Sequence, residues 1–145
     1  MIAVDTNVLV FAHRADSPWN VAAARGVTTL AEGRAPWAVP WACLHEFFAI
    51  VTHPRIYKPP TPIARAIDQI EAWLASPSLV LIGEADGYWR SLKPLLEGGL
   101  IEGPRVHDAR IAALCLLHGV AELWSADRDF SRFPGLRVVN PLVGQ

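Results

Sequence analysis

The sequence has few cysteines, little net charge and no long apolar run, and each shortage disfavours a class of protein. Its 145 residues include only two cysteines, Cys43 and Cys115, each within an apolar stretch. Two such thiols favour a reducing cytoplasm over a disulfide scaffold, and no Cys/His spacing suits zinc. The formal net charge of -1 and pI of about 6.5 disfavour a uniformly basic nucleic-acid binder but allow a local basic rim.

Segments that direct a chain to or across a membrane are also missing. No apolar run approaches the ~20 residues of a membrane-spanning helix. The start, Met1–Asp5, has no basic region and carries an acid, so we expect no signal peptide. A hydrophobic content of 52% over 145 residues is enough to bury a core. We therefore expect one cytoplasmic domain over residues 1–145.

Short apolar runs alternate with longer helical patterns along the chain. The segments expected to form strands are 2–4, 37–39, 78–82, 121–124 and 136–139. The segments expected to form helices are 17–32, 41–52, 63–75, 85–96 (with a bend at Pro94) and 106–118, with a further helix or turn from Val8. This alternation predicts an α/β fold in which a central, mostly parallel sheet of four to five strands carries helices on both faces.

Acidic residues occur at the ends of apolar stretches or inside them, at Asp5, Glu46, Asp108 and Asp127. A lone carboxylate on an apolar surface costs free energy, and a divalent cation is a favourable partner for several carboxylates together. Strand ends and helix positions of alternating α/β units converge on one edge of a sheet. Because oxygen ligands alone select Mg²⁺ or Mn²⁺, we predict a site for one of these ions.

Most of these acids also have an ordinary explanation. Asp5 follows the first strand and could cap the next helix, although Thr6 and Asn7 could cap it instead. Asp108 lies in a first helical turn, where an acid complements the helix dipole. Asp127, with Asp129 two residues later, could form a solvated turn or face one cation.

Glu46 is the acid that is hardest to explain without a metal. Its helical neighbours Ala42, Cys43, Ala49 and Ile50 are small or apolar, so we expect Glu46 on the buried side of its helix. A buried carboxylate needs a partner, which could be a metal ion or an arginine.

The segments around the acids carry a recognisable series of motifs. They are IAVDTNVL at 2–9, LHEF at 44–47, VTHPR at 51–55, VHDARIAA at 106–113, WSADRDF at 124–130 and FPGLRVVNP at 133–141. In order and spacing, over nearly the whole chain, this series resembles the PIN-domain ribonucleases, and in particular the VapC toxins of bacterial toxin–antitoxin pairs. The resemblance implies a PIN-like three-layer α/β/α sandwich and a single PIN domain over residues 1–145.

The resemblance also implies a function and a set of site residues. It implies a metal-dependent endoribonuclease that hydrolyses RNA phosphodiester bonds, leaves 3′-hydroxyl and 5′-phosphate ends, is blocked by a VapB-type antitoxin and forms a homodimer. The implied residues are the catalytic and metal-binding acids Asp5, Glu46, Asp108 and Asp127, the additional acid Asp129, and the supporting residues Thr6, Asn7 and Ser125.

RNA binding needs positive charge near the acids. Arg14, Arg55, Arg110 and Arg128 lie near them in sequence and are candidates for phosphate contact.

The nuclease has two alternatives. One is a catalytically silent, PIN-like regulatory or antitoxin-binding module, which the complete set of acids disfavours. The other is a phosphatase that uses an aspartyl nucleophile, which is weak because no acid follows the first Asp by two residues.

Overall fold

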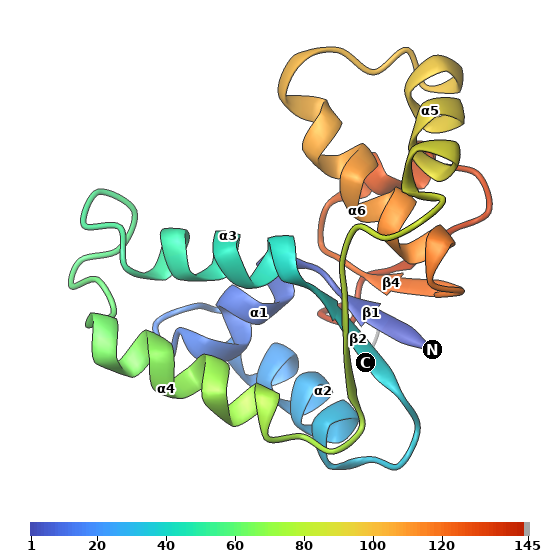
Figure 1. The fold of residues 1–145 in the computed structure, drawn as a ribbon. Helices are drawn as coiled ribbons and strands as arrows, with labels where there is room; N and C mark the ends of the chain where they lie inside the picture. The colour runs from blue at the N-terminus through green and yellow to red at the C-terminus, as the bar shows by residue number, and fades with distance from the viewer. Residues whose placement is uncertain (144–145) are drawn as a thin grey trace.

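The structure, a computed structural model, describes residues 1–143 and has a parallel sheet at its centre (Figure 1). The last two residues of the expected domain, Gly144 and Gln145, lie outside the described residues. Within residues 1–143, five strands form the sheet in the order β3-β2-β1-β4-β5. They are β1 (Ile2–Val4), β2 (Trp37–Pro40), β3 (Leu79–Ile82), β4 (Glu122–Trp124) and β5 (Arg137–Val139). All their pairings are parallel, so the predicted strands are confirmed to within one residue.

Helices cover both faces of this sheet. In the described part of the chain they are α1 (Thr6–His13), α2 (Asn20–Glu32), α3 (Trp41–Val51), α4 (Ile63–Leu74), α5 (Tyr88–Gly98) and α6 (Val106–Leu117), with the short 3₁₀ helices η1 (Gly103–Arg105) and η2 (Arg128–Arg132). In Figure 1, α5 and α6 lie on one side of the strands and the other α-helices on the opposite side. The predicted three-layer α/β/α sandwich is therefore confirmed.

Two helices begin later than the sequence patterns predict. The segment before α2 forms a turn, because Ser17 accepts hydrogen bonds from the Trp19 N–H with its hydroxyl and from the Asn20 N–H with its carbonyl. Before Tyr88, the backbone of Gly87 has a φ of 88°, which is outside the helical region and favours glycine. Local turn chemistry therefore sets both helix starts.

The order of the strands fixes where a ligand site can form. The chain moves from β1 outward to β2 and β3, and then crosses the sheet to place β4 and β5 beyond the other side of β1. Since parallel crossovers are right-handed, this reversal sends helices to opposite faces. The carboxyl ends of β1 and β4 then border a crevice at the reversal point, the usual position of ligand sites in open α/β sheets.

The core lies around the three central strands, β2, β1 and β4. Ala3, Val4 and Leu123 are fully buried, as are Trp37 and Val39 on β2. Strands that are apolar on both faces need helices on both faces, which the sandwich supplies. Within residues 1–143, no helix is both long enough and apolar enough to cross a bilayer.

Candidate metal centre

Acidic side chains from four separate segments line one cavity at the carboxyl edge of the sheet. Asp5 follows β1, Glu46 lies in α3, Asp108 lies in the first turn of α6, and Asp127 precedes η2. The cavity has a volume of about 220 Å³. Its remaining lining residues are Thr6, Asn7, Ile50, His107 and Ile111. The structure thus brings the predicted acids together at the reversal point of the sheet.

Asp5 is the most enclosed of these acids, with 6% of its surface exposed. Its Oδ1 accepts the Thr6 backbone N–H at 2.8 Å, so Asp5 caps α1, and the Cys43 thiol donates to the same oxygen at 3.7 Å. Its Oδ2 accepts the Ser125 hydroxyl at 2.8 Å and the Asn7 amide at 3.3 Å. Burial raises the pKa of Asp5 to about 6, and the hydrogen bonds from Ser125 and Thr6 oppose part of that rise.

Ser125 and Asn7 join the ends of the two central strands. The Ser125 hydroxyl, on a residue that is 2% exposed, accepts the Asp127 N–H at 3.0 Å and the Asn7 amide at 3.2 Å while it donates to Asp5. The Asn7 Oδ1 accepts the Ala126 N–H at 3.1 Å. These bonds fix the turn after β1 against the turn after β4, so the acids at both strand ends keep one relative position.

Asp108, Asp127 and Asp129 form a second, more open group. One carboxylate oxygen from each lies within 4.8 Å of the others. Asp108 and Asp127 are half-buried, and Asp129 is exposed. Burial, and then the negative charges of Asp127 and Asp129, raise the pKa of Asp108. The group therefore concentrates negative charge at the mouth of the cavity.

The predicted burial of Glu46 is wrong. Glu46 is exposed, and its Oε2 accepts the Thr6 hydroxyl at 2.9 Å across the cavity mouth. The buried stripe of α3 passes beside it, through Cys43 and Phe47. Ile50, one turn after Glu46, packs against the core and also lines the cavity. The apolar neighbours of Glu46 therefore lie inside the buried stripe and at its edge, and do not show that Glu46 is buried.

Sequence reasoning also missed one residue of the site, Arg132. Its guanidinium lies 3.7 Å from a carboxylate oxygen of Asp129, and its positive charge opposes the rise in the pKa of Asp108. The available signal was the spacing of three residues between Asp129 and Arg132, which a helical turn converts into a contact.

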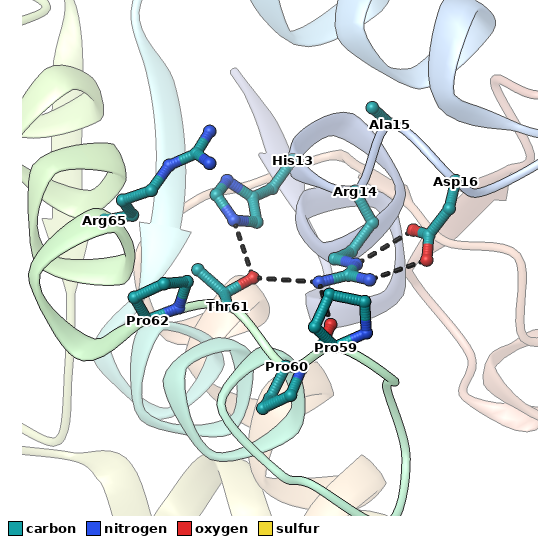
Figure 2. A pocket seen from close by; sticks show the side chains of 9 residues that line it. All are labelled: His13, Arg14, Ala15, Asp16, Pro59, Pro60, Thr61, Pro62 and Arg65. Atoms are coloured by element: carbon teal, nitrogen blue, oxygen red, sulfur yellow. Dashed lines mark hydrogen bonds and ion pairs between the residues drawn. The ribbon is translucent and has the colours of Figure 1, made fainter.

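The arginines predicted to contact phosphate lie in different settings. Arg14 lines a separate cavity, where its guanidinium is already hydrogen-bonded (Figure 2). Arg110 forms an ion pair with Glu84. Arg55, after α3, and Arg128, in η2, are exposed. The cavity that holds the acids includes none of these four in its described lining.

The donor set of the acidic cavity fits a hard divalent cation. Its carboxylate, hydroxyl and amide oxygens are the ligand types that Mg²⁺ and Mn²⁺ prefer. In the described chain, the Asp108–Asp127–Asp129 group is the one cluster of His, Cys, Asp and Glu with metal-binding geometry. A cation there would offset the mutual repulsion of the carboxylates.

Comparison with known proteins points to one family. A family model described as "PIN domain" matches residues 2–136. The chain is 32% identical to Ribonuclease VapC48 of Mycobacterium tuberculosis over 140 residues, which cover 97% of each chain. It is 34% identical to Ribonuclease VapC43 of the same species over 145 residues, which cover 100% of this chain and 98% of the relative.

Solved structures have the same fold. One is a crystal structure of VapBC2 from Rickettsia felis bound to a DNA fragment from their promoter, with a TM-score of 0.67, 23% identity and coverage of 97% of this chain and 98% of that chain. Another is VapC20 of Mycobacterium tuberculosis, described as a Sarcin-Ricin loop cleaving toxin, with a TM-score of 0.65, 18% identity and coverage of 90% and 93%.

Proposed function

This chain belongs to the PIN domain family, and from that premise we propose that it is a metal-dependent endoribonuclease, the toxin of a VapBC-type toxin–antitoxin system. The observation that carries the proposal is the convergence of acids from four segments on one cavity at the reversal point of the sheet. The relatives named VapC ribonucleases align over nearly their whole length, so the proposal concerns the entire chain, taken as a single domain.

The proposed ligands of a Mg²⁺ or Mn²⁺ ion are Asp5, Asp108 and Asp127, with Asp129 beside them as a direct or water-mediated ligand. When bound, such an ion polarises a phosphodiester and lowers the pKa of a water molecule that attacks it. Glu46, exposed at the cavity mouth, either joins the ligands or orients that water as a general base.

Three neutral residues support the acids. Thr6 donates its hydroxyl to Glu46, and Ser125 and Asn7 hold the Asp5 carboxylate through the hydrogen bonds described above. Such partners orient metal ligands, and removing them typically lowers metal affinity or activity by about 10- to 100-fold.

The proposed partners follow from the same family membership. They are an RNA substrate, with Arg55, Arg110 and Arg128 as candidate phosphate contacts, a VapB-type antitoxin, and a second copy of the chain in a homodimer. The structural similarity to VapBC2, a complex described as bound to its promoter, supports the antitoxin. We place the protein in the cytoplasm, where such an RNA substrate is present.

Cleavage of RNA by purified protein tests the proposed function. We expect cleavage with Mg²⁺ or Mn²⁺, none in excess EDTA, and a loss of at least about 1,000-fold in Asp127→Asn, because a direct ligand contributes several kcal/mol to transition-state stabilisation. Asp86→Asn, which removes the same charge from an exposed loop, should retain full activity. Mapping RNA 5′ ends in cells that express the wild type or Asp127→Asn identifies the target.

The same variants separate the nuclease from a silent regulatory module. A nuclease loses cleavage and toxicity in Asp127→Asn while it keeps its affinity for the antitoxin. Cleavage that persists in EDTA, or at the wild-type rate in Asp127→Asn, would exclude the metal mechanism. Antitoxin binding by a wild type that cleaves no RNA with either ion would favour the silent module.

A further inference from the structure

An acid-free basic segment follows the catalytic part of α3. Between Glu46 and Asp68 the chain carries Arg55, Lys58 and Arg65 and no acidic residue, although the net charge of the whole chain is -1. All three side chains are exposed. Within the described chain, none of the three has an ion pair, so their charge is available to a ligand. We call residues 52–65 the basic segment.

Arg14 holds this segment in a fixed shape. Its Nη1 donates to the Pro59 carbonyl at 3.0 Å and to the Thr61 hydroxyl at 3.2 Å, while its Nε and Nη2 donate to Asp16 at 2.9 and 2.6 Å (Figure 2). The guanidinium also lies 4.2 Å from the centre of the Tyr57 ring. Only 11% of the Arg14 side chain is exposed, and each of its three guanidinium nitrogens already donates a hydrogen bond. Arg14 is therefore a support for the segment and not a free phosphate ligand.

Further contacts add to this support. The Thr61 N–H donates to the Val51 carbonyl at 2.7 Å, which ties the end of the loop to the end of α3. The His13 ring, at the end of α1, is hydrogen-bonded to the Thr61 hydroxyl at 3.1 Å. Arg55 and Lys58 thus stand on a loop of defined conformation, and Arg65 lies in the first turn of α4 that follows it.

The basic segment follows α3 in sequence and contacts the end of α1, and each of these helices holds a site acid. α1 is capped by Asp5 and ends next to Arg14, and α3 carries Glu46 and ends at Val51. The rise from Glu46 to Val51 is about 7.5 Å. In Figure 1 the loop projects beyond the end of α3, away from α5 and α6. An RNA strand that leaves the acidic cavity along α3 meets this segment within a few nucleotides.

A cavity beside the segment offers a place for one phosphate. It has a volume of about 310 Å³ and lies between the end of α1, the proline-rich loop and Arg65 (Figure 2). Asp16 also lines this cavity, but it is paired with Arg14, so Arg65 supplies the available positive charge there. The nearest acid along α4 is Asp68, and no ion pair joins it to Arg65 among the described residues.

We propose that the basic segment binds the RNA backbone a few nucleotides from the scissile bond, with Arg55, Lys58 and Arg65 as phosphate contacts and Arg14 as a positioning residue. The inference rests on the proposed function. Its physical reason is that the acids of the cavity repel phosphates, so affinity for RNA has to come from positive charge outside the cavity. Phosphate contacts of this kind position a strand without reading its bases.

The test compares a long and a short RNA that contain the same cleavage site. In the triple variant Arg55→Gln/Lys58→Gln/Arg65→Gln, we expect kcat/KM to fall roughly 10- to 100-fold on an RNA of about 20 nucleotides and to change less than about 2-fold on one of about 4. The slope of log affinity against log salt should become shallower by about 2, since each lost contact removes about 0.7.

A charge-matched variant controls for net charge. Arg25→Gln/Arg34→Gln/Arg90→Gln removes three other exposed arginines that have no ion pair in the described chain, and it should behave as the wild type. If both triple variants cleave and bind the long RNA equally, the proposal is wrong. It is also wrong if the basic-segment variant loses only its affinity for the antitoxin.

Arg14→Lys tests the positioning role. Lysine keeps the charge but lacks the planar fork that reaches Asp16, Pro59 and Thr61 together. We expect a higher KM for the long RNA with an unchanged kcat/KM for the short one, whereas general damage to the fold would lower kcat/KM for both RNAs.

Binding of the long RNA is measured in parallel by fluorescence anisotropy. It tests the surface even if the wild type fails to cleave RNA, an outcome that would count against the proposed function alone.

Discussion

Asp5 and the Asp108–Asp127–Asp129 group belong to one acidic site but are held in opposite ways. Asp5 is 6% exposed and accepts hydrogen bonds from Thr6, Asn7 and Ser125. The other three carboxylates stand within 4.8 Å of one another at a more open position. The fold itself therefore fixes Asp5, the inner acid. The Asp108–Asp127–Asp129 group, which we call the outer group, gains most from a cation. Substitutions in the two parts should therefore have different effects on stability and on metal affinity.

The largest expected effect concerns the inner acid and pH. Burial raises the pKa of Asp5 from 3.8 to about 6, so the native state holds this proton more tightly than the unfolded state does. The contribution of Asp5 to metal-free stability is therefore most favourable below pH 4. This contribution is lost as the pH rises to about 6, and the total loss is about 3 kcal/mol. Asp5→Asn removes this dependence.

The measurement is a difference between proteins. The free energy of unfolding is determined by urea titration in EDTA between pH 4 and pH 8 for the wild type and for Asp5→Asn. The wild type should lose stability relative to Asp5→Asn over this range. Asp86→Asn controls for the loss of one charge at an exposed position. A constant difference between wild type and Asp5→Asn would show that Asp5 titrates normally.

The next effect concerns the hydrogen bonds that hold the inner acid. Ser125→Ala removes a donor to Asp5 and an acceptor for the Asp127 N–H inside the protein. An unsatisfied buried polar group costs about 1 to 3 kcal/mol, so we expect a loss of about 2 kcal/mol in metal-free stability. Because the Ser125 hydrogen bond lowers the pKa of Asp5, the loss should be greater at pH 8 than at pH 4.

Ser131→Ala is the matched control for this substitution. Ser131 also donates its hydroxyl, to the Arg128 carbonyl, but at an exposed position where water replaces the bond. Its stability should change by less than about 0.5 kcal/mol. Equal losses in the two variants would mean that Ser125 does not act through Asp5.

The contrast between the two parts of the site also explains what the sequence could predict. Strand positions and the convergence of the acids follow from short apolar runs in alternating α/β order, since parallel strand ends meet at one edge. The burial of Glu46 was predicted wrongly because small and apolar neighbours at helical spacing also occur at the edge of a buried stripe, where the residue between them is exposed. The support of the basic segment by Arg14 depends on Pro59 and Thr61, which folding alone brings to it. No local pattern contains such a contact.

The smallest expected effect concerns the outer group and Arg132, the one positively charged side chain described beside it. Arg132 lies 3.7 Å from Asp129 and opposes the rise in the pKa of Asp108. Arg132→Gln leaves the outer carboxylates less compensated, so metal-free stability should fall by about 0.5 kcal/mol, the usual contribution of a partly exposed ion pair. The same loss of positive charge makes the site more attractive to a divalent cation, and Mg²⁺ or Mn²⁺ affinity should rise about 2-fold.

Isothermal titration calorimetry with Mn²⁺ measures the metal affinity of this variant, and urea unfolding in EDTA measures its metal-free stability. Ser125→Ala should lower both stability and metal affinity, because it disturbs a ligand that the fold positions. Arg132→Gln should lower stability and raise affinity, because it changes charge without moving a ligand. Lys93→Gln breaks another exposed ion pair, with Glu97 in α5, and should leave metal affinity unchanged. If Arg132→Gln weakens Mn²⁺ binding instead, Arg132 positions Asp129, and the outer group is then built by the fold in the same way as Asp5.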